Sequence, residues 1–276
     1  MSHTRFHRLA WIAGGAALCV AAVLAQQKNP GYTDTPILPG QKWHVHDPDR
    51  PHPPIVTPGP EGSVRDHLPP SDAVVLFDGK DLSRWAQQGS GASAGKLVDP
   101  RWTVRDGYFE VAPGTGDLLT RDNFGDCQIH IEWSEPPDVH GDGQERGNSG
   151  VYLMGRYEIQ VLDSSGTVTY ADGQAGALYG EFPPLVNPIR KPGQWNAYDI
   201  VVDAPRFEAG KVAKPLSVTL LFNGVLAHDH RALTGPTEHR TVGVYQPHGD
   251  GPLLLQDHGS KVRFRNIWIR RISGMA

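Results

Sequence analysis

Cysteine is nearly absent from this chain, and its scarcity excludes two kinds of protein. The 276 residues contain 2 cysteines, which are Cys19 and Cys127. Cys19 lies in an apolar N-terminal segment, so a chain without that segment keeps Cys127 alone. A single cysteine can support neither a disulfide framework nor a cysteine-based metal site.

Long runs of positive charge are also missing. The chain has 26 Lys and Arg against 30 Asp and Glu, which gives a formal net charge of −4. Nucleic acids and anionic membranes attract clustered Lys and Arg side chains, and this sequence has no such cluster. We therefore expect a small or neutral partner and no nucleic acid.

The third absence is sustained helical periodicity. The 32 glycines and 24 prolines argue against a mainly helical protein. Short segments of strand character occur instead, between clusters of Gly, Pro, Asn and Asp. They cover residues 74–77, 102–104, 108–111, 127–133, 150–154, 157–162, 197–202, 216–222, 242–245, 252–256 and 261–271. Many strands without helices between them predict an all-β sandwich or jelly roll over residues 71–273.

Two β-hairpins are predicted from their turn residues. "WTVRDGYFEV" places Asp106 and Gly107 at a bend, and "SVTLLFNGVLAHD" does the same with Asn223 and Gly224. Asp-Gly and Asn-Gly pairs suit tight turns because both central positions need a positive φ. The flanking segments should therefore pair as antiparallel strands.

The N-terminal segment 1–25 is interpreted as a signal peptide. Arg5 and Arg8 precede an apolar run, and "VLA" ending at Ala25 supplies the small residues typical of a cleavage site. A membrane anchor and lipoprotein processing at Cys19 are the alternatives. We expect export to the periplasm or the exterior, with no stable membrane insertion after cleavage.

Residues 26–70 are predicted to form a proline-rich extended arm or linker. Prolines recur every few residues, which removes backbone donors and favours extended chain. Within the arm, "HVHDPDRPH" brings His44, His46, Asp47 and His52 close in sequence. These residues can be a weak metal site, or simply part of a polar arm that lies on its own domain.

Polar side chains alternate along three of the predicted strands. In "YEIQV", Glu158 and Gln160 share one face, opposite Tyr157, Ile159 and Val161. "CQIHIEW" places Glu132 in the same way, and "LLLQDHG" adds Gln256 and His258. If the strands share one sheet, these groups form a surface suited to sugar hydroxyls. The alternative is that they form a solvated outer face, that His258 is an ordinary loop histidine, and that Asn148 and Arg265 have structural roles.

Retaining β-glucanases of the concanavalin-like fold resemble this architecture and use the pattern Glu-x-Asp-x-x-Glu. The corresponding stretch here runs from Glu158 through Gln160 to Asp163. Gln160 cannot share a proton with its neighbours, and Asp163 lies on the opposite face unless a bulge intervenes. Ordinary double displacement at this stretch is therefore not expected.

The chain also resembles the 3-keto-disaccharide hydrolase family over residues 72–272. The similar blocks occur in order along the chain. They are "LFDGKDLSRW", "WTVRDGYFEV", "IEW", "NSGVYL", "YEIQVLD", "GALYG", "KPGQWNAYDI", "LFNGVL", "GPLLLQDHG" and "VRFRNIWIR".

This resemblance implies a concanavalin A-like jelly roll and a carbohydrate substrate whose glucose C3 carries a ketone. The ketone acidifies the C2 proton, so a base can remove it and the enolate can expel the group at C1. On this hypothesis Glu132, Glu158 and His258 divide base, acid and orienting roles, while Asn148, Gln160, Gln256 and Arg265 bind sugar oxygens. A divalent metal is possible and its ligands are unknown. A non-catalytic carbohydrate-binding module and an ordinary glycosidase are the alternatives.

Overall fold

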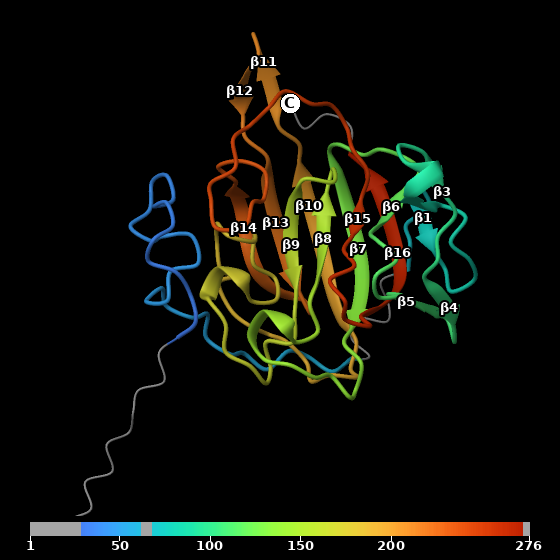
Figure 1. Cartoon of the computed structure of the whole chain (residues 1–276), viewed down its shortest axis with the longest axis horizontal. Coiled ribbons are helices and arrows are strands. Elements are labelled where there is room, and N and C mark those ends of the chain that lie inside the picture. The colour runs from blue at the N-terminus through green and yellow to red at the C-terminus, as the bar shows by residue number, and fades with distance from the viewer. Residues whose placement is uncertain (1–28, 62–67, 273–276) are drawn as a thin grey trace, which may run out of the picture.

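Antiparallel strands in two sheets form the framework of the protein. The structure is a computed structural model that describes residues 29–61 and 68–272. The larger sheet has eight strands in the order β14-β13-β10-β7-β16-β5-β4, with β1 beside β16 (Figure 1). Its strands are β1 (Val74–Phe77), β4 (Thr103–Arg105), β5 (Tyr108–Glu110), β7 (Cys127–Ser134), β10 (Asn196–Asp203), β13 (Ser217–Phe222), β14 (Val225–Ala232) and β16 (Arg263–Arg271).

The smaller sheet has six strands in the order β3-β2-β6-β15-β8-β9. They are β2 (Trp85–Gln88), β3 (Leu97–Val98), β6 (Leu118–Thr120), β8 (Ser149–Leu153), β9 (Tyr157–Val161) and β15 (Leu254–Leu255). A separate two-stranded hairpin joins β11 (Arg206–Glu208) to β12 (Lys211–Lys214). The helical elements in the described residues are the short 3-10 turns η2 (Gly91–Ser93), η3 (Gly143–Glu145) and η4 (Ala171–Gly173).

The two sheets bury one apolar core between them. Ile129 and Ile131 of β7 belong to the same buried cluster as Ile159 and Val161 of β9. Alternation along each strand sends every second side chain into this core and the others away from it. The protein is therefore an all-β jelly-roll sandwich, as its sequence predicts.

The predicted hairpins are confirmed by backbone geometry. Asp106 and Gly107 have φ of 49° and 78°, and they connect β4 to β5. Asn223 and Gly224 have φ of 52° and 78°, and they connect β13 to β14. Both turns have the left-handed backbone that Asp, Asn and Gly tolerate best.

The strand prediction fails at residues 242–245, which form no ladder. Their composition suits a strand, but Val244 is exposed and no neighbouring strand pairs with it. Strands β2 and β6 were not predicted. Trp85–Gln88 has two adjacent glutamines and Leu118–Thr120 has three residues, so tertiary pairing decides both.

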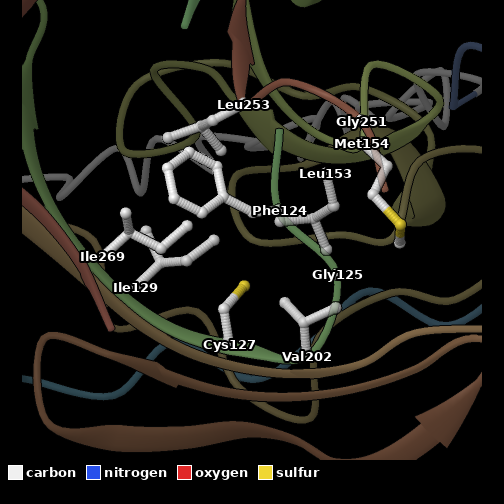
Figure 2. A pocket seen from close by; sticks show the side chains of 10 residues that line it. All are labelled: Phe124, Gly125, Cys127, Ile129, Leu153, Met154, Val202, Gly251, Leu253 and Ile269. Atoms are coloured by element: carbon white, nitrogen blue, oxygen red, sulfur yellow. The ribbon is translucent and has the colours of Figure 1, made fainter. Parts of the chain in front are cut away.

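The core contains one small apolar hollow. Figure 2 shows Cys127, Phe124 and Leu153 around it, and its volume is about 10 Å³. Such a space is too small and too apolar to hold a sugar. Burial raises the pKa of the Cys127 thiol to about 12, so this cysteine is a protonated packing residue.

No helix within residues 29–61 and 68–272 has the length and apolar character needed to cross a bilayer. The predicted signal peptide, residues 1–25, lies outside the described residues.

Candidate active site

A polar pocket lies on the outer face of the smaller sheet, away from the core. Its volume is about 180 Å³. This is smaller than the roughly 300–1,000 Å³ of sites for drug-sized ligands, so a single sugar ring is the size of ligand that fits. The lining residues are Gln144, Asn148, Tyr152, Glu158, Gln160, Tyr179, Thr237, Glu238, His239, Gln256 and His258.

Strand register assembles the floor of this polar pocket. Tyr152 of β8 lies directly opposite Glu158 of β9, and Gly150 lies opposite Gln160. Strand β15 pairs with the other edge of β8, and the backbone N–H of Gln256 donates to the carbonyl of Gly150 at 3.0 Å. Because their neighbours Val151 and Ile159 point into the core, these polar side chains all point outward.

Gly150 leaves the space that the Glu158 carboxylate occupies. A Cβ at position 150 would overlap that carboxylate and lie 3.0 Å from the Glu158 Cδ and 2.7 Å from a ring carbon of Tyr152. The glycine in "NSGVYL" is thus required by close side-chain packing rather than by a turn.

Glu158 is a buried carboxyl with an unusual proton affinity. Its side chain is 3 % exposed, and the Tyr152 hydroxyl donates to its Oε2 at 2.8 Å. Burial raises the pKa of Glu158 to about 8, more than the Tyr152 hydrogen bond lowers it, and the nearby charge of Asp117 raises it further. The group can therefore hold or release a proton near neutral pH.

Two side-chain amide oxygens in the pocket can each accept a hydrogen bond from a ligand. Gln160 Nε2 donates to Asn148 Oδ1 at 3.0 Å, and Asn148 Nδ2 donates to the carbonyl of Gln144 at 2.7 Å. Gln160 Oε1 and Gln256 Oε1 are buried without a hydrogen-bond partner among the described residues. A ligand rich in hydroxyl groups would satisfy both oxygens.

His258 lies at the exposed rim of the pocket, in the turn after β15. The preceding residue fixes this turn, because Asp257 Oδ2 accepts the backbone N–H groups of Thr115 at 2.9 Å and Gly116 at 3.0 Å. These two bonds attach the loop from which His258 lines the pocket.

The opposite wall was not predicted from the sequence. Tyr179 and His239 line it, and the Tyr179 hydroxyl lies 3.1 Å from His239 Nδ1. Thr237 anchors this wall, because its Oγ1 accepts the backbone N–H of Glu158 at 2.8 Å. The block "GALYG" contains Tyr179 but gives no hint of its orientation, and "PTEHR" has no strand or motif signal.

The pocket gathers five of the seven predicted site residues, namely Asn148, Glu158, Gln160, Gln256 and His258. Their individual roles remain predictions. The shared surface that we expected for Glu132, Glu158, Gln160, Gln256 and His258 is wrong for Glu132. Arg265, which was expected to bind a sugar oxygen, also lies outside the pocket.

Glu132 lies on β7 of the larger sheet, where its neighbours Ile131 and Trp133 face the core. Its side chain therefore points out of the opposite side of the sandwich from Glu158. Arg265 Nε lies 2.6 Å from Glu132 Oε2, so the two residues form an ion pair there. Alternation defines a face relative to one sheet and does not say which sheet a strand joins.

The environment of Glu132 also differs from that of Glu158. Burial by itself would raise the pKa of Glu132, but hydrogen bonds with His130, Asn266 and Arg265 outweigh it and hold the pKa below its usual value. A carboxylate with such partners stays charged and serves to join strands.

Asp163, the last position of the glucanase-like spacing, is also outside the pocket. It has no exposed surface and its Oδ2 lies 2.6 Å from Arg146 Nε. The sequence expectation that this stretch lacks a pair of facing catalytic carboxylates agrees with that geometry.

The described residues contain no group of three or more His, Cys, Asp and Glu side chains arranged to hold a metal ion. In the arm, His44 Nδ1 contacts the carbonyl of Thr35, while His46 Nδ1 pairs with Asp172. These two histidines are thus engaged separately, as in a polar arm lying on its domain.

The chain is similar to known proteins, and the family model and the curated relative that it matches carry related descriptions. The family model described as "3-keto-alpha-glucoside-1,2-lyase-like domain" matches residues 72–270. A 3-keto-disaccharide hydrolase from Bacteroides thetaiotaomicron is 22 % identical over 240 residues, which cover 71 % of this chain and 77 % of the relative.

Solved structures from Parabacteroides distasonis, provisionally described as glycosyl hydrolases, are also similar. One is 44 % identical with a TM-score of 0.70, and the match covers 80 % of this chain and 93 % of that one. Another is 21 % identical with a TM-score of 0.52, covering 79 % and 99 % respectively, and it shows similarity of fold alone.

Replacing Gly150 by alanine should displace the Glu158 carboxylate, because the new methyl group occupies its place. We expect Gly150→Ala to lower the free energy of unfolding by about 1–3 kcal/mol, as overpacking of a tight site does. Gly249→Ala is the matched control, since no atom lies within 4 Å of the place that its new methyl group would take. Urea unfolding measures both variants, and equal stability of the two would contradict this packing argument.

The raised pKa of Glu158 predicts a pH dependence of stability. Below about pH 4.5, Glu158 is protonated in both the folded and the unfolded state. Between pH 4.5 and about 8, Glu158 loses its proton in the unfolded state but keeps it in the folded state, so the folded state loses stability as the pH rises. Wild-type protein should therefore lose more stability than Glu158→Gln across this range. The difference should amount to a few kcal/mol, since one pKa unit corresponds to about 1.36 kcal/mol.

Urea unfolding at pH 5, 6, 7 and 8 tests this expectation. Glu208→Gln is the control, because Glu208 is exposed on β11 and should leave the wild-type slope unchanged. Parallel pH profiles for wild type and Glu158→Gln would show that the Glu158 pKa is not raised.

Proposed function

This chain belongs to the 3-keto-alpha-glucoside-1,2-lyase-like domain family, and we propose that it cleaves the glycosidic bond of 3-keto-glucosides or 3-keto-disaccharides. The names of its relatives, a 3-keto-disaccharide hydrolase and provisionally described glycosyl hydrolases, support the broader class of glycosidase. The proposed route is removal of the C2 proton and elimination, followed by hydration.

The chemistry of the oxidised sugar makes this route accessible. A base takes the C2 proton, and the electron pair moves toward the C3 ketone to give an enolate. The enolate then re-forms the ketone and a C1–C2 double bond while the C1–O bond breaks, and the departing oxygen takes up a proton. Water adds to C1, a proton returns to C2, and a 3-keto sugar is released. The route needs one base, one acid and a donor to the enolate oxygen, and no oxocarbenium ion.

Glu158 is the observation that carries this proposal. A carboxyl with a pKa of about 8 is mostly protonated at neutral pH, so it can supply the proton that the departing oxygen needs. Tyr152 orients it through the 2.8 Å hydrogen bond to Oε2. His258 is assigned as the base for the C2 proton, because it lines the same pocket from the turn after β15.

The remaining lining residues bind and orient the sugar ring. Gln160 Oε1 and Gln256 Oε1 accept hydrogen bonds from sugar hydroxyls, which satisfies their unmet capacity. Asn148 holds the Gln160 amide in place through its 3.0 Å contact. Tyr179 on the opposite wall can donate a hydrogen bond to an oxygen of the bound ring.

Paired substrates test the proposed reaction. Purified protein should release the aglycone from a 3-keto-glucoside and leave the unoxidised glucoside nearly intact, because only the ketone acidifies C2. Glu158→Gln should lower kcat by about 10²–10⁴-fold, the usual contribution of a general acid. The exposed Glu208→Gln on β11 is the matched control and should retain wild-type activity.

The outcomes separate three classes of protein. Equal turnover of the two glucosides would favour an ordinary glycosidase and contradict elimination. Sugar binding without any product would favour a carbohydrate-binding module. Running each assay with and without a chelator determines whether a divalent metal takes part.

We also propose that the chain is exported to the periplasm or out of the cell. Its support is the signal-like segment 1–25, with basic residues, an apolar run and a small-residue site at Ala25. Expression of the full chain in a bacterial host should give a mature N-terminus at Gln26, measured by intact mass. A full-length chain retained in membranes would instead favour an uncleaved anchor.

A further inference from the structure

The proline-rich arm is attached to the domain beside the polar pocket. The buried Asp172 carboxylate of η4 accepts the backbone N–H of His46 at 3.0 Å and lies 3.1 Å from His46 Nδ1. Arg50, also in the arm, lies 3.6 Å from the same carboxylate. His46 and Asp172 are both fully buried, although 126 positions separate them in the chain.

The His46 ring lies directly behind the pocket wall. Its centroid is 3.9 Å from that of Tyr170, 4.9 Å from that of Tyr179 and 5.5 Å from that of His239. Tyr179 and His239 are the two residues that form the wall opposite His258. Tyr170 joins this group through its hydroxyl, which lies 2.8 Å from that of Tyr179.

The arm also holds the segment that carries His239. Arg240 pairs with Asp34 of the arm at 3.0 Å, and its guanidinium lies 4.0 Å from the ring centre of Tyr32. The arm therefore contacts both chain segments that make this wall. His46 contacts the segment that carries Tyr179, and Asp34 contacts the segment that carries His239.

Two features of His46 indicate that it positions other residues. Its φ of 58° is in the left-handed region, which is costly for a histidine. Its Nδ1 lies against Asp172, and its Nε2 is buried without a hydrogen-bond partner among the described residues. A residue chosen for stability alone would avoid both costs.

We infer that the arm is a constituent of the active site and that its His46, held by Asp172, is a positioning residue for the Tyr179–His239 wall. The inference rests on the proposed function in one respect, which is that the pocket binds the 3-keto sugar ring. His46 does not contact the sugar. It fixes the side chains that do.

Kinetics of His46→Ala in the full mature chain test this role. Loss of the supporting ring should raise KM for a 3-keto-glucoside about tenfold, because small displacements of binding groups are costly, and should change kcat less. His44→Ala is the matched control, since His44 belongs to the same arm but contacts the carbonyl of Thr35 within it. It should retain wild-type KM.

His46→Phe separates positioning from general stability. Phenylalanine keeps a flat ring against Tyr170 but loses the contact of the His46 ring with Asp172, so its KM should lie between those of wild type and His46→Ala. This variant also serves if His46→Ala does not fold, as judged by circular dichroism. Wild-type KM in His46→Phe and in a folded His46→Ala, or an equal rise of KM in His44→Ala, would overturn the inference.

A second measurement does not depend on activity. The ring signals of His239 in a histidine NMR spectrum should shift in both His46 variants and stay unchanged in His44→Ala. If no variant or wild-type protein cleaves the 3-keto-glucoside, the proposed function fails while this spectrum still decides the role of His46. Unchanged His239 signals in a folded His46→Ala would refute that role.

Discussion

The hydrogen bond between Tyr152 and Glu158 is the interaction on which the site depends. It joins directly opposed residues on two paired strands, and it is the contact that compensates a carboxyl taken out of water. A neutral hydroxyl stabilises a carboxylate less than a cation does, so burial dominates and the proton stays bound near neutral pH.

A second buried carboxylate in the same protein shows why the partner matters. Glu132 is as deeply buried as Glu158, at 3 % exposure, but it lies beside Arg265 at 2.6 Å and Asn266 at 2.8 Å. Its pKa moves down where that of Glu158 moves up. One carboxylate links strands of the larger sheet, whereas the other has a proton affinity suited to chemistry in a pocket.

The arm supports the pocket from outside the sandwich. A sheet face by itself is open to water, so the polar pocket needs walls from loops and structural support for those loops. The segments that carry Tyr179 and His239 gain such support from the arm, through the buried His46–Asp172 contact and the Arg240–Asp34 pair. A proline-rich segment is suited to this purpose because it loses little conformational freedom when it is laid along a surface.

The fold class, both tight hairpins and the outward direction of Glu158 and Gln160 could be predicted from the sequence, because alternation and turn chemistry are local properties of the chain. The sequence also grouped Gln256 and His258 with them correctly. The position of Glu132 and Arg265 in the other sheet could not be predicted, since strand parity carries no information about sheet membership. The same holds for Tyr179, His239 and His46, which meet through long-range packing between loops and an arm without periodicity.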